Sequence, residues 1–463
     1  MQNLGDTKKA VVLGEKAYKQ RRDVLGENHP DTLLALNNLA SFYNSCGDTA
    51  KALDTIEKVY NLRCKISGER HPETLTSLSN YSLYSYTNGK NEQALALGEK
   101  ALALSIEIFG ENHDETAKVI NNISFFHHSL GNHYVAVELG KKAYEIYLKT
   151  IGTDHPLVVT VLKNLSVYYY ALNDYVNAEI WCERYYNLSL KLNGENHPET
   201  ISSINDYATI CFTNDKFTVA AQLFEKLYSI RKAQLGENHA DTLIALANYG
   251  YSCTHAGMYD EALSLYKKLY DGYCKTLGEY AEKTLDILTR LGGAYYNVND
   301  HEKAAETYYK LYQAHRLVSG DDNIATMRAL ANYAYELTDD GKYAEAVEPS
   351  KKVYEGFVTH YGQHHKATVA ILDNLGYCYA KLSRFDESIE IYKQVYDMRC
   401  IAFGEKHKST VYVLISLGSA YKKIGNIPQA VEYYNKAYNI FLETLGADHK
   451  DTLDAKSKLD ELK

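Results

Sequence analysis

The sequence lacks the features that mark membrane, secreted and nucleic-acid-binding proteins. No apolar run approaches the roughly 20 residues that a membrane-spanning helix needs, and the first residues show no basic segment followed by an apolar one. The net charge of -9 leaves no excess of basic side chains for phosphate contacts. We therefore expect no membrane span, no secretory signal and no nucleic-acid partner.

The cysteines lack the spacing of metal or redox sites. The eight cysteines include no CxxC pair, and most occupy positions that other segments of the chain fill with apolar residues. Cysteines of this kind are typical of reduced packing residues, so we expect a cytoplasmic protein.

Motifs of catalysis and of metal binding are also missing. The sequence contains no GxxxxGK[ST], GxSxG, HExxH or EF-hand pattern. The histidine pairs His127–His128 and His364–His365 have no third ligand at metal spacing. Carboxylates are abundant, but most fall on predicted polar faces and linkers. We therefore expect no enzymatic activity, no cofactor and no metal site.

What the sequence does contain is one repeat that never loses register. The motif Gly-Glu-Asn-His-Pro-Asp-Thr at residues 26–32 recurs, with substitutions, every 42 residues. The later copies begin at Gly68, Gly110, Gly152, Gly194, Gly236, Gly278, Gly320, Gly362, Gly404 and Gly446. A period of 20 to 50 residues indicates stacked repeats in which each unit contacts only its neighbours. We predict a single solenoid over residues 1–463.

Each repeat predicts two helices, and positions are counted here from the motif glycine. Glycine suits the end of a helix, and Pro at +4 suits the first turn of the next. This helix, A, runs to a turn near +21, which is glycine in six repeats. A second helix, B, carries Ala at +26 and Tyr at +34 in nine of ten repeats, on one helical face. The predicted class is all-α, built from antiparallel helix pairs.

Helix A with Leu39, Ala40 and Tyr43, and the turn with Gly257, Tyr259 and Ala262, resemble a tetratricopeptide repeat. The 42-residue length, the linker motif and residues 36–40 resemble its kinesin-light-chain-like subclass. The resemblance implies a right-handed superhelix with ten complete repeats over residues 26–445. Residues 1–25 are then a helix B without its helix A, and residues 446–463 a capping helix. The unpaired first helix indicates a chain cut from a longer protein or an exposed first helix.

A histidine occupies +3 in nine of the eleven motifs, which raises the question of a metal row. The nine are His29, His71, His113, His155, His197, His239, His365, His407 and His449. Two nitrogens that bind one zinc ion lie within about 4 Å of each other. Packed helices lie about 8–10 Å apart, so successive histidines cannot share an ion. We expect these histidines to cap helix A or to bond the adjacent loop.

A row of asparagines at +12 is the candidate binding feature. It comprises Asn38, Asn80, Asn122, Asn164, Asn248, Asn332 and Asn374, with Asp206, Arg290 and Ser416 in the remaining repeats. The resemblance implies that helix A lines a concave groove and that this asparagine bonds a ligand's backbone. A carboxamide has the two donors and the acceptor needed to do so. The alternative is a stacking ladder in which each asparagine bonds the next repeat.

Aromatic side chains at +15 and +18 are expected to share that surface. The candidates are Phe125, Tyr170, Tyr251, Tyr296, Tyr335 and Tyr377. Carboxamides among aromatic rings suit a peptide with apolar or aromatic anchors. The repeats that begin at Gly278 and Gly320 lose the linker histidine (Ala281, Asn323), which indicates either drift or a specialised patch.

Two functions follow from these observations. The first is a protein-interaction module, a scaffold or adaptor that binds a peptide or a partner's surface in the groove. The alternative is the ligand-sensing arm of a larger bacterial signalling NTPase or protease, whose other domains are then partners of this chain. A P-loop domain encoded upstream of Met1 would favour the second, and a genuine start codon there the first.

The groove and the ladder make different predictions for the triple change of Asn122, Asn164 and Asn248 to Ala. If the row binds a ligand's backbone, affinity for the partner falls at least tenfold, about 1.4 kcal/mol, with little effect on folding. If the row is a ladder, the melting temperature falls and any loss of binding follows from unfolding. Calorimetry and a binding titration on one preparation separate the two.

Overall fold

The computed structural model describes residues 2–462, and within this range all of the regular structure is helical, in 22 helices. The predicted all-α class is confirmed. The B helices are α1 (Gln2–Leu25), α3 (Thr49–Ser67), α5 (Asn91–Phe109), α7 (His133–Thr150), α9 (Tyr175–Asn193), α11 (Phe217–Leu235), α13 (Tyr259–Leu277), α15 (His301–Ser319), α17 (Tyr343–Tyr361), α19 (Phe385–Phe403) and α21 (Ile427–Leu445). The A helices are α2 (Pro30–Ser45), α4 (Pro72–Thr87), α6 (Asp114–Ser129), α8 (Pro156–Ala171), α10 (Pro198–Thr213), α12 (Ala240–His255), α14 (Glu282–Asn297), α16 (Ile324–Asp339), α18 (Lys366–Lys381), α20 (Lys408–Lys423) and α22 (Lys450–Asp460).

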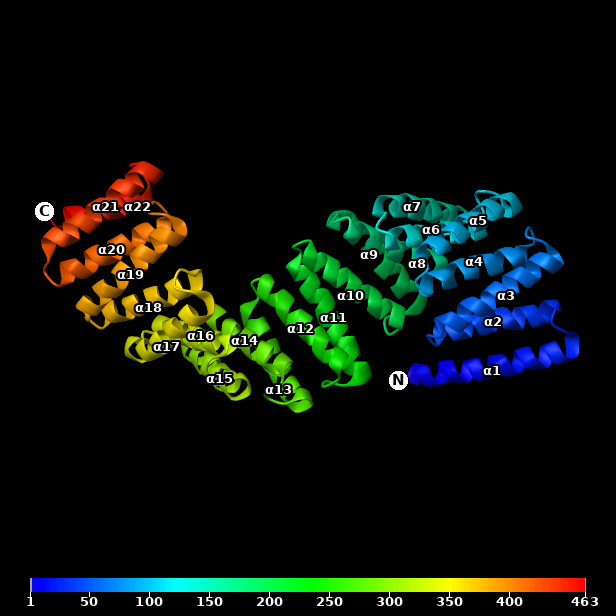
Figure 1. The fold of residues 1–463 in the computed structure, drawn as a ribbon, viewed down its shortest axis with the longest axis horizontal. Coiled ribbons are helices and arrows are strands. Elements are labelled where there is room, and N and C mark those ends of the chain that lie inside the picture. Colours follow the sequence, from blue (N-terminus) through cyan, green and yellow to red (C-terminus); the bar gives the residue numbers. More distant parts are fainter. Residues whose placement is uncertain (1, 463) are drawn as a thin grey trace. The chain divides into compact units, whose positions relative to one another are not determined.

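The chain divides by its internal contacts into two compact units, Met1–Leu227 and Tyr228–Lys463. In each unit the helices stack in antiparallel order along the chain, as Figure 1 shows for α2 to α5. The single solenoid over residues 1–463 stays a prediction, because it requires the repeats to continue from one unit into the next. No helix within residues 2–462 combines the length and the apolar character that crossing a lipid bilayer requires.

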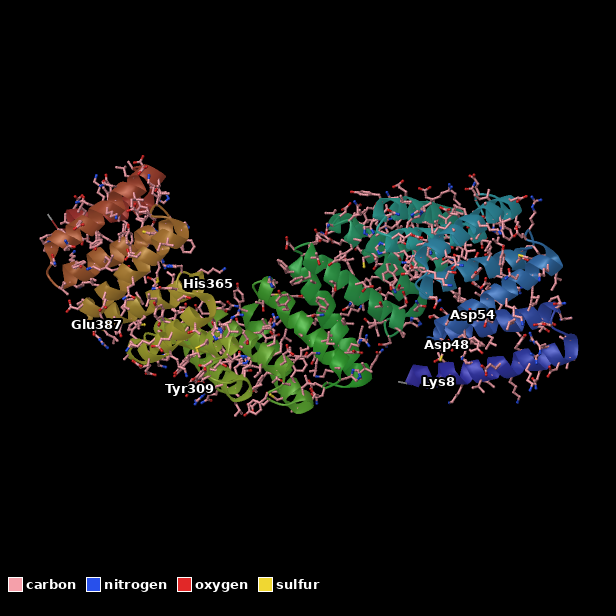
Figure 2. The ribbon with its side chains drawn as sticks, viewed as in Figure 1. Lys8, Asp48, Asp54, Tyr309, His365 and Glu387 are labelled. Atoms are coloured by element: carbon pink, nitrogen blue, oxygen red, sulfur yellow. The ribbon has the colours of Figure 1, made fainter. Side chains whose placement is uncertain are left out.

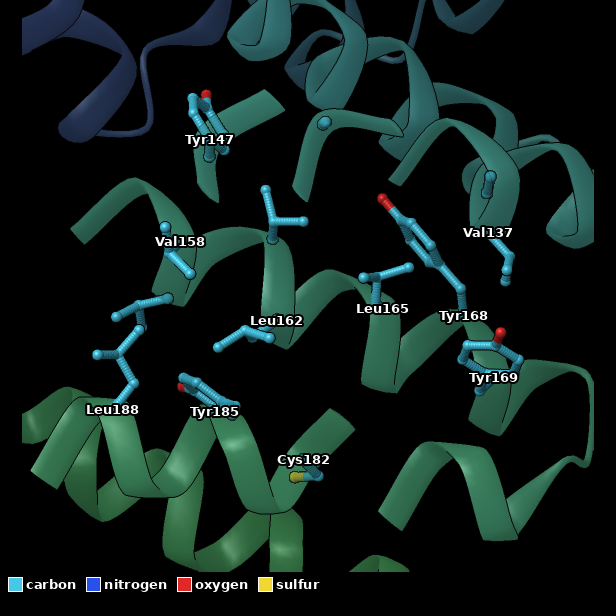
Figure 3. Packing of buried hydrophobic residues seen from close by; sticks show 14 of the residues in the cluster. Val137, Tyr147, Val158, Leu162, Leu165, Tyr168, Tyr169, Cys182, Tyr185 and Leu188 are labelled. Atoms are coloured by element: carbon cyan, nitrogen blue, oxygen red, sulfur yellow. The ribbon is translucent and has the colours of Figure 1, made fainter. Parts of the chain in front are cut away.

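The core of each unit is a layer of apolar side chains between consecutive helices. In unit 1, Tyr147 of α7, Leu165 and Tyr168 of α8, and Tyr185 of α9 are all at most 1% exposed (Figure 3). The Ala at +26 is buried in all nine repeats that carry it, as Ala136 and Ala178 illustrate, and so is Ser388, which replaces it in the tenth. The eight cysteines are free thiols, four of them fully buried.

The linker between helix B and the next helix A is held by its own motif. The glycine adopts a left-handed conformation, with φ of +88° at Gly236, which residues with a Cβ avoid. At all nine histidine positions, Nδ1 accepts a hydrogen bond from the backbone N–H two residues later. The expected cap is therefore confirmed, as at His365, whose side chain accepts from the N–H of Ala367 at the start of α18 and whose position is labelled in Figure 2.

The threonine at +6 stabilises the same linker from its buried side. Its side chain is fully buried, and in six repeats its hydroxyl donates to the carbonyl of the motif glycine, at 2.8 Å for Thr242 and Gly236. Because both partners belong to the motif, the angle between helix B and helix A is set locally.

The divergent linkers provide a natural test of the cap. Asn323 keeps it, since its Oδ1 accepts from the N–H of Ala325 at 2.8 Å, whereas Ala281 provides no side-chain acceptor. A helix N-cap is worth about 0.5–2 kcal/mol. We expect Ala281→Asn to raise the midpoint of urea unfolding, His197→Ala to lower it, and His197→Asn to leave it nearly unchanged. A loss of stability in Ala281→Asn would contradict the assignment.

Candidate functional site

The A helices lie on the inner side of the curvature within each unit. Successive A helices approach each other directly in the pairs α2–α4, α4–α6 and α6–α8 of unit 1 and α16–α18 of unit 2. Across residues 2–462, no two successive B helices make comparably extensive contacts. In a curved stack the elements on the inside lie closest together, and repeat proteins use that concave surface for binding.

The asparagine row divides into two sets on this surface. In the first set the carboxamide bonds the preceding repeat: Asn80 Nδ2 donates to Asn37 Oδ1 at 3.3 Å, and Asn164 Nδ2 donates to Asn121 Oδ1 at 3.1 Å. Asn374 Nδ2 likewise donates to the hydroxyl of Thr338 in the preceding repeat, at 3.1 Å. At these three positions the ladder is what the structure contains.

The second set comprises Asn38, Asn122, Asn248 and Asn332. Within the described part of the chain, their carboxamides have no hydrogen-bond partner in the protein. Asn38 is exposed and the other three are half-buried. Their donors and acceptors therefore face solvent or a ligand.

Position +11, which the repeat pattern did not predict as functional, supplies the acceptors Asn37 and Asn121. The signal was present in the sequence as the doublets Asn37–Asn38 and Asn121–Asn122. Adjacent residues on a helix point in directions about 100° apart, so one member of a doublet can face the next repeat while the other faces the groove.

The predicted aromatic residues differ in how accessible they are. Tyr170, Tyr251, Tyr296 and Tyr377 are each 38–48% exposed. Phe125 is half-buried, with its ring 4.9 Å from that of Tyr86 in an edge contact. Tyr335 is also half-buried, and burial raises the pKa of its hydroxyl to about 12. Four of the six rings thus offer open apolar surface, and the other two are partly covered.

Two hollows open on the A-helix face. Each is lined by a charged residue that replaces the asparagine at +12, Arg290 in one and Asp206 in the other. In unit 2 a hollow of about 530 Å³ lies between α12 and α14 and is lined by Asn248, Tyr251, Lys283 and Arg290, among others. The Arg290 guanidinium lies over the Tyr251 ring, 5.0 Å from its centroid, and its Nε donates to Asp286 at 3.1 Å. Glu282 and Asp286 also line this hollow, so its two cationic and two acidic side chains balance, and the Arg290 guanidinium lies next to an aromatic face.

The hollow in unit 1 is lined by one charged residue, the acidic Asp206. It measures about 220 Å³ and lies between α8 and α10, with Val167, Tyr170, Ile210 and Asp206 in its wall. Burial raises the pKa of the Asp206 carboxyl, and the nearby Lys163 opposes that rise. Lys163 itself is paired with Glu199 at 3.4 Å, and Asp206 has no ion-pair partner among residues 2–462. A half-buried carboxylate without a counter-ion suits a cationic group.

The B helices of consecutive repeats also make polar contacts, and these lie apart from the A-helix face. Lys100 Nζ lies 3.0 Å from the Tyr60 hydroxyl of the preceding repeat and 2.9 Å from Glu69. The same Tyr–Lys–carboxylate cluster recurs around Lys226 and Lys352. In these clusters the hydroxyl of the +34 tyrosine thus reaches a polar partner while its ring packs between helices. These lysines are partly exposed, so each pair contributes only about 0–1 kcal/mol.

Comparison with known proteins gives one family match and several similar structures. The family model described as tetratricopeptide repeat matches residues 1–65, 31–107, 115–191, 200–275, 283–357 and 367–443. No curated protein matches the chain.

Among solved structures, nearly identical TPR-like repeats assigned to a kinesin light chain of Podosopora anserina are 22% identical over 45% of this chain and 98% of theirs, with a TM-score of 0.41. BtubC (BKLC) from P. vanneervenii is 20% identical over 51% of this chain and 92% of its own, with a TM-score of 0.42. The apo form of RapI is 12% identical over 84% of this chain and 98% of its own, with a TM-score of 0.46.

Proposed function

Since the chain belongs to the tetratricopeptide-repeat family, whose solenoids typically serve as protein-interaction scaffolds, we propose that its A-helix face binds an extended peptide or a segment of a partner's surface. The observation that carries the proposal is the set of carboxamides with no partner in the protein, three of which lie three residues before an aromatic side chain. Asn122 and Phe125 are three residues apart on α6, and Asn248 and Tyr251 on α12. Residues three apart on a helix share one face.

This arrangement matches what an extended chain requires. A peptide backbone presents an N–H and a C=O at every residue, and a carboxamide can bond one of each. The rings beside the carboxamides provide apolar area with little side-chain entropy to lose. The surface therefore suits backbone recognition with apolar anchors, as the sequence analysis expected.

The two hollows add selectivity within each unit. The hollow at Arg290 suits an aromatic or polar side chain of the ligand, because the Tyr251 ring and the guanidinium donors not used by Asp286 line it, while Glu282 and Asp286 balance the charges of Lys283 and Arg290. The hollow at Asp206 suits the aliphatic stem and the charged end of a lysine or arginine, since it joins apolar walls to a carboxylate. We propose no enzymatic activity for the chain, and a cytoplasmic location consistent with its eight free thiols.

The split of the asparagine row provides a sharp test. A partner is first isolated with the full chain as bait and then titrated against two double variants. Asn122→Ala with Asn248→Ala removes carboxamides that the protein itself does not use. We expect affinity to fall at least tenfold, since two hydrogen bonds are worth about 1–3 kcal/mol together, with the melting temperature unchanged.

Asn80→Ala with Asn164→Ala removes carboxamides that bond the preceding repeat, so the melting temperature is expected to fall. Matched controls come from the solvent-facing side of the B helices: Tyr134→Glu and Tyr309→Lys install residues found at the same positions of other repeats. Both controls are expected to bind as the original chain does. Unchanged affinity in the first double variant, or a loss of affinity only in the B-helix controls, would overturn the proposal.

A further inference from the structure

Three departures from the repeat pattern converge at one place in unit 2. His301 begins α15, while Glu336 and Asp339 lie in the last turns of α16, in the next repeat. Both repeats are ones in which the linker histidine is lost. The position of Glu336, +16, holds Phe, Tyr, Ile, Ser, Ala or Cys elsewhere, and that of His301, +23, is most often aromatic.

The three side chains lie close enough to share one ion. His301 Nδ1 lies 3.0 Å from Glu336 Oε2, and one ligand atom from each of His301, Glu336 and Asp339 lies within 4.8 Å of the others. The Glu336 side chain is only 7% exposed, and its one ion-pair partner among the described residues is His301. The Tyr296 ring packs edge-on against the imidazole, with centroids 5.6 Å apart.

The cluster has the composition of a metal site and is not needed for the fold. His301 Nδ1 and Glu336 Oε2 can both carry a lone pair that points at the other atom. At 3.0 Å, a proton or a metal ion must therefore lie between them. A carboxylate buried without a lysine or arginine is costly. Other repeats fill the Glu336 position with Ala294 or Cys378 and form the same helices. Nothing in the packing of the repeat therefore requires a carboxylate there.

We propose that His301 Nδ1 and the carboxylates of Glu336 and Asp339 bind one zinc ion, with solvent completing the coordination. One imidazole and two carboxylates are a donor set that Zn²⁺ accepts, and bonds of about 2.0–2.2 Å require the ligand atoms to move together only slightly. The sequence predicted no metal site because the ligands come from two repeats, 35 and 38 positions apart, and form no contiguous motif. The ion would join the end of α16 to the start of α15.

The test uses the full chain and zinc buffered with nitrilotriacetate, so that weak binding by the linker histidines does not register. Cobalt(II) serves as a second probe, because its absorption spectrum reports nitrogen and oxygen ligands. We expect one ion per chain and a higher melting temperature with zinc than with EDTA. Three variants are expected to weaken binding at least tenfold and to abolish the zinc-dependent rise: His301→Tyr, Glu336→Gln and Asp339→Asn.

The array of repeats provides matched controls. Tyr343 and Asn297 occupy the positions of His301 and Asp339 in neighbouring repeats, and Glu336→Gln keeps the shape of the side chain, so the variants are expected to fold. His133→Tyr changes the histidine at the same position of another repeat, where Nδ1 lies 3.1 Å from His128 Nδ1, and is expected to bind zinc normally. The proposal fails if the unaltered chain binds no ion, if His301→Tyr binds as tightly as before, or if His133→Tyr abolishes binding.

Discussion

The closure of the linker between helix B and the next helix A is the constraint on which the rest of the structure depends. The glycine turns the chain, the histidine caps helix A, and the buried threonine hydroxyl bonds the glycine carbonyl. Each repeat packs only on its neighbours, so an error in this angle would be repeated along the stack. The glycine turn recurs in all eleven linkers, the histidine cap in nine of them and the threonine bond in six.

The contacts that hold the repeats together leave part of the A-helix face unused. Apolar side chains bury the interface between helices, and the Tyr–Lys–carboxylate clusters link consecutive B helices. On the A helices, Asn80, Asn164 and Asn374 also contribute to stacking. Three members of the asparagine row thus contribute to stacking, and the proposed binding surface uses the other four.

The helices could be predicted because their signals are local and repeated. Glycine, proline and the capping histidine mark each helix end, and the buried Ala at +26 marks the face that packs. One detail escaped the sequence. Where glycine is missing at +21, Asn173, Asp215, Asn299 and Ser383 still adopt positive φ values of 57–60°. The turn therefore imposes a left-handed residue whatever the side chain, at a cost that glycine avoids.

The binding surface could be predicted only in part. The period indicates which positions share a face, but not which carboxamide finds a partner across the gap between repeats, because that depends on the residue offered by the preceding repeat, at +11 for Asn80 and Asn164 and at +18 for Asn374. The hollows at Asp206 and Arg290 were visible in the sequence as interruptions of the row without a stated role. The cluster of His301, Glu336 and Asp339 needs the packing of two repeats before it appears.

The measurement that tests the account most directly is hydroxyl-radical footprinting of tyrosines in the complex with a partner. Tyr170, Tyr251 and Tyr377 on the A helices are 38–41% exposed, and Tyr309 on the B helices is 42% exposed, so their rates in the free protein are comparable. If the A-helix face binds the partner, the partner protects the A-helix tyrosines and leaves Tyr309 and Tyr134 as reactive as before. Protection of the B-helix tyrosines alone would contradict it.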